Sequence, residues 1–179
     1  DNRAMRRRAE DLATGEWAVL AALAEGPTHG FAVARLLARD GEAGQIWTVK
    51  RALVYHSIDR LVELELAETI GEEASASGPR RMMVRATPVG KRRVTRWLSQ
   101  PVDHLRDARS LLMLKLLFLS RRGADPEALL RAQRTEFERM EHGFEAGARE
   151  TNGFAGTLAL WRLESARAGI VRMSNAAWL

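Results

Sequence analysis

Residues 48–88 read TVKRALVYHSIDRLVELELAETIGEEASASGPRRMMVRATP. The first part of this segment has apolar residues at Val54, Ile58 and Leu61, a spacing that places them on one face of a helix. We therefore predict a helix over about 49–65 with Thr48 as its N-cap. That face is expected to be buried, together with Leu53, Ser57 and Leu64 beside it. The opposite face is expected to be exposed, and it carries Ala52, His56, Asp59 and Glu63, flanked by Arg51, Tyr55 and Arg60.

The second part of the segment contains two short strand patterns, over 67–73 and 80–86. The residues between them are small and end in Gly78-Pro79, which predicts a hairpin loop. Thr87-Pro88 predicts the start of a helix over about 88–99, because Thr is a good N-cap and Pro is favoured at the first helical position.

Two more helices are predicted upstream of this segment. One covers about 15–24, with Thr14 as its N-cap and Gly26-Pro27 as its end, and the next covers about 29–39, with Thr28 as its N-cap. The apolar face of the second helix consists of Phe31, Val33, Ala34, Leu36 and Leu37. Three helices, a β-hairpin wing and a further helix make a winged helix-turn-helix domain, which we place at 1–101.

The remaining residues, 102–179, are predicted to be all-α, so the fold class is mainly α with a small β-hairpin wing. Helices are expected over about 105–121, from Asp125-Pro126 to about 150, and from 154 to the end. The segment 111–119 is apolar on nearly every side, and a partner chain is the obvious source of cover for it. The last helix carries an apolar seam of the coiled-coil kind, formed by Leu163, Ala166, Ile170, Met173 and Ala177.

The composition excludes several classes of protein. The chain has 179 residues, a net charge of +5 and no cysteine, which excludes disulfide scaffolds, thiolate metal sites and cysteine nucleophiles. The longest apolar run, 111–119, is interrupted by Lys115 and is far shorter than the ~20 residues that cross a bilayer. With no export signal at its start, the protein is expected to be cytoplasmic and to have no membrane partner.

Basic residues are concentrated in one region of the chain. Between Ala74 and Val102 there are seven of them and no acidic residue, and a second group lies at Arg3, Arg6, Arg7 and Arg8. Such patches attract polyanions. We therefore predict that residues 80–96 face phosphate, the alternative being a solvated surface. The arginines at the N-terminus are equally consistent with a groove-binding arm and with a tail that makes no contact.

No catalytic motif is present. The four histidines lie in separate segments, and the sequence has no His-Glu-x-x-His pair, no Gly-x-Ser-x-Gly elbow and no phosphate-binding Gly-rich loop. We expect no enzyme activity, no cofactor and no metal site.

The N-terminal half of the 49–65 helix holds the residues suited to reading DNA. A recognition helix contacts base edges near its N-terminus, where Lys50, Arg51, Tyr55 and His56 lie. Arg51 is the candidate for a bidentate guanine contact, and Lys50 is the candidate for a phosphate contact. Two roles are open for Tyr55, groove contact and half-buried core residue, and groove contact is favoured over core packing for His56.

Four further residues are candidates outside this helix. Arg80 and Arg81 follow the tip of the wing and could reach the adjacent minor groove or its phosphates, the alternative being a solvated hairpin end. Thr28 and Thr48 are predicted to begin helices, whose N–H groups can hold phosphate, and ordinary capping is at least as good an explanation.

These residues resemble the phenolic-acid-decarboxylase-regulator (PadR) family of bacterial repressors over nearly the whole chain. The resemblance rests on the following motifs: Leu20 to Leu23, Gly26-Pro27, His29-Gly30-Phe31, Val54-Tyr55-His56-Ser57-Ile58-Asp59-Arg60-Leu61, Gly78-Pro79-Arg80-Arg81 and Ala86-Thr87-Pro88-Val89-Gly90. The long C-terminal half is similar to the family's larger subclass, which ends near a Trp, as this chain does at Trp178. Three departures concern Ala52-Leu53, His56, and Met82-Met83-Val84, where the family has Gly-Thr, Pro and an aromatic pair.

The resemblance implies a homodimer in which 102–179 is the helical dimerisation domain. It also implies binding to double-stranded DNA at a palindromic operator, and repression relieved by a small-molecule effector. The polarizable side chains that could hold a flat aromatic effector are Trp17, Trp47, Trp97, Met113, Met140, Trp161 and Trp178; core packing is the more frequent role for each tryptophan, and no ligand residue is assigned. The competing function is a winged-helix module that binds protein, which the acidic residues Asp59, Glu63, Glu65 and Glu68 would suit.

Overall fold

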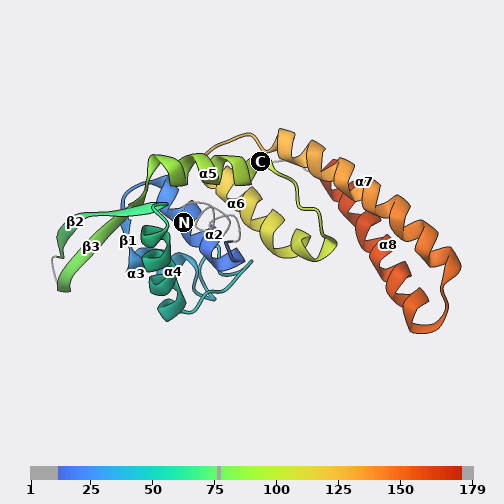
Figure 1. Ribbon diagram of the computed structural model, residues 1–179, viewed down its shortest axis with the longest axis horizontal. Helices are drawn as coiled ribbons and strands as arrows, with labels where there is room; N and C mark the ends of the chain where they lie inside the picture. Colours follow the sequence, from blue (N-terminus) through green and yellow to red (C-terminus); the bar gives the residue numbers. More distant parts are fainter. Residues whose placement is uncertain (1–11, 76–77, 175–179) are drawn as a thin grey trace, which may run out of the picture. The chain divides into compact units, whose positions relative to one another are not determined.

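The computed structural model describes residues 12–75 and 78–174 of the chain. It divides into two compact units, Asp1–Leu98 and Ser99–Leu179 (Figure 1), called here the N-terminal and C-terminal units. The N-terminal arginines, Ala177 and Trp178 lie outside the described residues. No helix in the described part is long and apolar enough to cross a membrane.

Helix α2 (Thr14–Glu25) is the central helix of the N-terminal unit, and Val19, Leu20 and Leu23 are completely buried in it. Its N-cap is Ala13, so the prediction that Thr14 caps this helix is wrong. Glu16 satisfies the start of the helix instead, because its Oε2 accepts a hydrogen bond of 2.8 Å from the Ala13 N–H. This bond is the half of a capping box in which the third helical residue binds the N–H of the N-cap, and no side chain caps the helix from Ala13 itself.

The second helix is shorter than predicted and begins later. Thr28 and His29 form strand β1 (Thr28–His29), and α3 (Gly30–Leu36) follows with His29 as its N-cap. The Nδ1 atom of His29 accepts a hydrogen bond of 3.1 Å from the Ala32 N–H. The prediction that Thr28 caps this helix is therefore wrong, because Thr28 is paired with Val84 in the sheet.

Helix α4 (Arg51–Glu63) packs against α2 and α3. Val54, Ser57, Ile58 and Leu61 are buried, as the spacing predicts, but Leu53 is exposed. The N-cap is Lys50 and not Thr48, whose Oγ1 donates a hydrogen bond of 2.8 Å to the Gly44 carbonyl in the preceding loop. The prediction of a Thr48 cap is therefore wrong by two residues.

The wing is a three-stranded antiparallel sheet in the order β1-β3-β2. Strands β2 (Ala67–Ser75) and β3 (Gly78–Ala86) form the predicted hairpin, which extends away from α2 and α4 in Figure 1. The register shifts between Thr69 and Gly71, where Gly71 has a φ of +125°, and this bulge bends the strand. The third strand, β1, has only two residues and therefore carries no alternating pattern in the sequence.

Helix α5 (Pro88–Ser99) has the predicted bounds, and its predicted cap is confirmed by the 3.1 Å hydrogen bond from the Gly90 N–H to the Thr87 Oγ1. Trp97 of this helix is buried and stacks on Trp17 of α2, with ring centroids 5.1 Å apart and an interplanar angle of 3°. This stacking fixes α5 to α2 within the N-terminal unit. The described structure therefore confirms the winged helix-turn-helix fold.

Residues 105–121 of the C-terminal unit are helical throughout but change their winding. A 3-10 turn (Leu105–Asp107) and a π-helical turn (Ala108–Leu112) lead into α6 (Met113–Arg121). Leu112, Leu114, Leu116 and Phe118 are all buried within the single chain. The argument that this segment needs a partner chain for cover is therefore wrong, although it does not bear on whether the protein is a dimer.

Helices α7 (Glu127–Glu150) and α8 (Gly153–Ser174) form a hairpin whose two arms lie side by side (Figure 1). The predicted seam faces α7 of the same chain, since Ala166, Ile170 and Met173 share a core cluster with Phe137 and Met140. Gly169 allows this close packing, because a Cβ there would lie 2.7 Å from the Phe137 ring.

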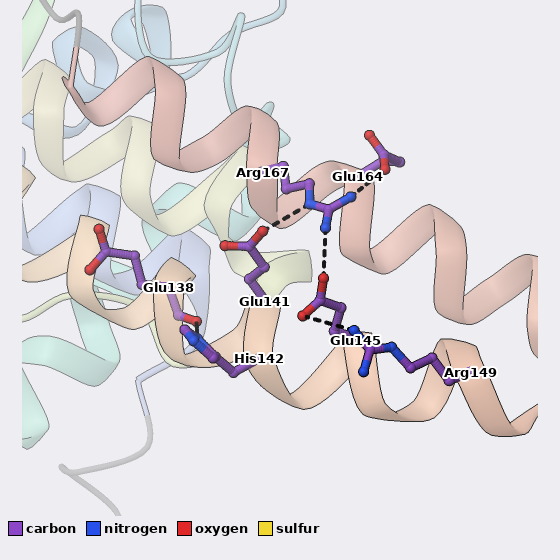
Figure 2. A network of polar contacts seen from close by, with 7 residues as sticks. All are labelled: Glu138, Glu141, His142, Glu145, Arg149, Glu164 and Arg167. Atoms are coloured by element: carbon purple, nitrogen blue, oxygen red, sulfur yellow. Dashed lines mark hydrogen bonds and ion pairs between the residues drawn. The ribbon is translucent and has the colours of Figure 1, made fainter.

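Arg167 of α8 reinforces the hairpin on its polar side. Figure 2 shows its guanidinium reaching Glu141 and Glu145 of α7 as well as Glu164 of α8, at 2.8, 3.0 and 3.1 Å. The hydrogen bond to Glu141 is the main reason that the pKa of Arg167 is raised above its ordinary value. Three carboxylates of two helices thus share one cation.

Gln133 of α7 connects that helix to the start of the C-terminal unit. Its side chain is completely buried and bonds both polar groups of the Val102 backbone. Oε1 accepts from the Val102 N–H at 2.7 Å, and Nε2 donates to the Val102 carbonyl at 3.0 Å. The side-chain amide therefore replaces the two hydrogen bonds that a neighbouring strand would otherwise provide.

Lys115 is the buried cation of this unit. Its side chain is only 3% exposed, and its Nζ donates a hydrogen bond of 2.6 Å to the Gln100 carbonyl. Burial lowers the pKa of Lys115 to about 8, against the opposing effects of Asp103 and Asp107. The charged form of this side chain is therefore less favourable in the folded unit than in the unfolded chain.

We expect stability to rise with pH because of this group. Between pH 8 and 10.5 the unfolded chain binds more protons at Lys115 than the folded one, so the free energy of unfolding increases across that window. The gain is at most about 3 kcal/mol. Urea unfolding of the wild type should show this rise and Lys115→Met should lack it, whereas the exposed Lys91→Met should behave like the wild type. Equal pH dependence in both variants would contradict the assignment.

Candidate nucleic-acid interface

The start of α4 presents the predicted reading residues to solvent. Lys50, Arg51, Tyr55 and His56 are all exposed, with Tyr55 at 40%. The acidic residues of this helix, Asp59 and Glu63, lie in later turns. The N-terminal half of the exposed face is therefore basic, and the other half is acidic.

Two aromatic rings hold Arg51 in place. The guanidinium carbon lies 5.3 Å from the centroid of the Phe31 ring and 5.8 Å from that of the Tyr55 ring, within the range of cation–π attraction. No hydrogen bond or ion pair to a carboxylate is seen for Arg51 among the described residues, so its N–H groups remain able to donate to a planar acceptor pair. The contacts with the two rings therefore restrict the conformations of the Arg51 side chain on the surface.

Gly30 makes room for this arrangement. A Cβ at Gly30 would lie 2.6 Å from the Cε1 atom of Tyr55, so any side chain there would displace the ring. The Tyr55 ring thus packs one edge on the backbone of α3 and leaves the rest exposed. The structure therefore supports the half-buried packing role of Tyr55, and groove contact stays a prediction.

Most basic residues of the wing are paired with carboxylates. Arg80 lies 3.3 Å from Glu72, and Arg85 lies 2.7 Å from Glu68, both on β2. The stretch free of acidic residues in the sequence therefore faces acidic residues across the hairpin. Such exposed ion pairs are weak, so phosphate can compete with the carboxylate for Arg80.

Arg81 differs from these two arginines. Its Nη1 atom lies 3.1 Å from Nε2 of His29, and no carboxylate of the described residues lies within ion-pair distance of it. His29 in turn stacks near Phe31, with ring centroids 6.3 Å apart. A continuous series of contacts thus runs from Arg51 on α4 through Phe31 and His29 to Arg81 on the wing.

The side chains of Thr28 and Thr48 do not take part in this series of contacts. Thr28 is half-buried within β1, and Thr48 is exposed but bonded to the loop that precedes α4. Neither begins a helix, which removes the reason for assigning phosphate to them.

Three residues of this surface are missed by sequence reasoning. Phe31 is assigned to the core face of its helix, but it is 41% exposed beneath Arg51. Leu53 is placed beside the buried stripe, but it is 54% exposed at the first turn of α4. His29 belongs to a motif noted in the sequence, but its contact with Arg81 depends on the β1–β3 pairing, which periodicity does not reveal.

The side chains considered for an effector are dispersed. Trp17 and Trp97 stack on each other, Met140 belongs to the core of the C-terminal unit with Met113 packed against it, and Trp47 and Trp161 are exposed. The described residues contain no group of three His, Asp or Glu side chains that could hold a metal ion.

Comparisons with known proteins find likenesses among solved structures only. No family model matches the chain, and no curated protein matches it. Among solved structures, the chain is similar to Bacillus subtilis PadR, which was crystallised in complex with operator DNA. The TM-score is 0.43 at 19% identity, over 89% of this chain and 95% of that one.

Proposed function

We propose that this chain is a dimeric, sequence-specific DNA-binding transcriptional regulator of the PadR type. The observation that carries the proposal is the continuous surface from Arg51 to Arg81, which joins the start of α4 to the wing through Phe31 and His29. A helix start and a wing that share one basic surface can engage the major groove and the adjacent backbone together.

Each contact then has a specific role. Arg51 donates to a guanine edge, Lys50 binds phosphate, and His56 and Tyr55 contact the groove beside them. Arg80 and Arg81 of the wing bind the minor groove or its phosphates. Repression and its relief by a small aromatic effector are inferred from the sequence resemblance alone.

Dimerisation is proposed for the C-terminal unit. The face of α8 that is turned away from α7 exposes several large apolar side chains, and Phe154 is 83% exposed and Trp161 64% exposed. Leu160 and Val171 are also more than half exposed. Large apolar side chains gathered on one helix are typical of an interface. A two-fold dimer would place two α4 helices on half-sites about one helical turn apart.

The test is binding of duplex fragments selected from the source genome, measured by fluorescence anisotropy across a salt series. If each subunit neutralises ~3–5 phosphates, log affinity should fall with log salt at a slope of roughly −5 to −9. Footprinting should show two symmetric patches. A single asymmetric patch, or no binding at low salt, would contradict the proposal.

Arg51→Ala should weaken specific binding by about 1–3 kcal/mol and relax the preference at one base pair. Arg80→Ala should weaken all sequences alike and reduce the salt slope by about one. The matched control is Arg131→Ala, since Arg131 is an exposed arginine of α7 paired with Glu127 and lies outside this surface. Unchanged binding in both Arg51→Ala and Arg80→Ala would favour the protein-binding alternative or place the DNA site elsewhere.

A further inference from the structure

One ring nitrogen of His29 already accepts a hydrogen bond within the protein. Its Nδ1 atom accepts the Ala32 N–H at 3.1 Å as the N-cap of α3, so Nδ1 carries a lone pair and not a proton. A neutral imidazole has one protonated nitrogen, and here that nitrogen is therefore Nε2. The cap thus turns the outer edge of the ring into a hydrogen-bond donor.

The group next to Nε2–H of His29 is the guanidinium of Arg81, which is also a hydrogen-bond donor. Nη1 of Arg81 lies 3.1 Å from Nε2 of His29, and a guanidinium has no acceptor atom. The two groups cannot satisfy each other, and among the described residues no ion pair joins Arg81 to Glu73, its cross-strand neighbour on β2, so both donors are available to an external acceptor. Arg80 and Arg85 of the same strand differ, because Glu72 and Glu68 already provide them with carboxylate oxygens.

The two donors lie on the same face of the wing sheet. His29 pairs with Met83, and Arg81 stands two residues before Met83 on β3, so both side chains project on one side. Arg81 is exposed and His29 is half-buried. An oxygen atom that approaches from solvent can reach Nε2–H and the guanidinium at once.

We propose that Nε2–H of His29 and the guanidinium of Arg81 together bind one phosphate oxygen of the duplex backbone. This inference rests on the proposed function and assigns the phosphate between the recognition helix and the wing to a specific pair. A single oxygen with several lone pairs accepts both bonds, and the negative charge offsets the cation of Arg81. No covalent chemistry is involved.

His29→Ser separates the two roles of the histidine. Serine is a good N-cap, so α3 keeps its acceptor, but it has no second donor that reaches Arg81. We expect duplex affinity to fall about three- to tenfold in this variant, as for one lost hydrogen bond. Arg81→Ala should also weaken binding and reduce the salt slope by about one. The double variant should bind more weakly than either single variant. Its fold loss of affinity relative to the wild type should be smaller than the product of the two single fold losses, because both side chains bind the same oxygen.

Arg85→Ala is the matched control, because Arg85 lies on the same strand but is paired with Glu68. It should change affinity less than Arg81→Ala. Wild-type binding in both His29→Ser and Arg81→Ala would overturn the inference while the proposed function stands. Absence of duplex binding by the wild type would instead overturn the proposed function itself.

The tautomer gives an independent measurement. A long-range ¹H–¹⁵N spectrum of the ¹⁵N-histidine protein should show Nε2 of His29 protonated and Nδ1 unprotonated, with the resonance assigned by its loss in His29→Ser. Duplex DNA should shift Nε2, and inorganic phosphate at the same phosphate concentration should not. A proton on Nδ1, or equal shifts with both ligands, would overturn the inference.

Discussion

Replacing Gln133 by Ala is expected to destabilise the C-terminal unit by about 3–5 kcal/mol. The substitution removes the partner of both the N–H and the carbonyl of Val102 and leaves a cavity where the completely buried side chain was. Each unsatisfied backbone group carries the cost of its lost solvation. Urea unfolding followed by circular dichroism measures this loss.

Two variants make this result specific. Gln133→Glu keeps the size of the side chain and can still accept from the Val102 N–H, but it sets a second oxygen against the Val102 carbonyl. It should therefore also destabilise the unit. Gln100→Ala removes an exposed glutamine side chain of the same unit and should change the unfolding free energy by no more than about 0.5 kcal/mol. Equal stability of Gln133→Ala and Gln100→Ala would contradict the role assigned to Gln133.

In the DNA-binding dimer proposed above, replacing Trp161 by Glu is expected to separate the two subunits and to lower DNA affinity by about 100-fold or more. The substitution puts a charge in the middle of the exposed apolar face of α8, between Phe154 and Val171. In the proposed dimer, binding of one α4 helix to its half-site raises the effective concentration of the second α4 helix at the other half-site. Such linkage increases affinity by about 10²- to 10⁴-fold, and the monomer would lose this gain. Light scattering measures the oligomeric state, and anisotropy measures the affinity.

Thr135→Glu is the control for this experiment. Thr135 is exposed on α7, so the substitution adds the same charge to the hairpin away from the apolar face of α8. It should leave both the dimer and the DNA affinity intact. A Trp161→Glu protein that remains dimeric would show that the interface lies elsewhere.

The sequence predicts most of the fold because its signals there are local. Thr87-Pro88 marks a helix start and the Gly-Pro pair marks a hairpin by residue type alone, and the stripe of Val54, Ile58 and Leu61 marks a buried helix face. The helix start, the hairpin and the buried face are confirmed, but Gly78-Pro79 belongs to β3 and not to the loop. The predicted N-caps Thr14, Thr28 and Thr48 are wrong because the caps are Ala13, His29 and Lys50, whose positions depend on the folded backbone.

The sequence predicts only those parts of the candidate site that depend on local signals. The exposure of Arg51 and His56 follows from their helical positions, and the structure places them as expected. The support of Arg51 by Phe31 and the contact between His29 and Arg81 join residues far apart in the chain. The first depends on the packing of α3 against α4, and the second depends on the short strand β1, which no pattern in a single sequence marks.

Glu16 has a structural consequence for α4. The same carboxylate that holds the Ala13 N–H also binds Arg60 of α4 at 2.6 Å, and Glu16 is nearly buried. The ion pair therefore joins the start of α2 to the last turns of α4, at the end of α4 opposite to Arg51. We expect α2 and α4 to move together, so that a shift of α2 would also displace the residues proposed to contact DNA.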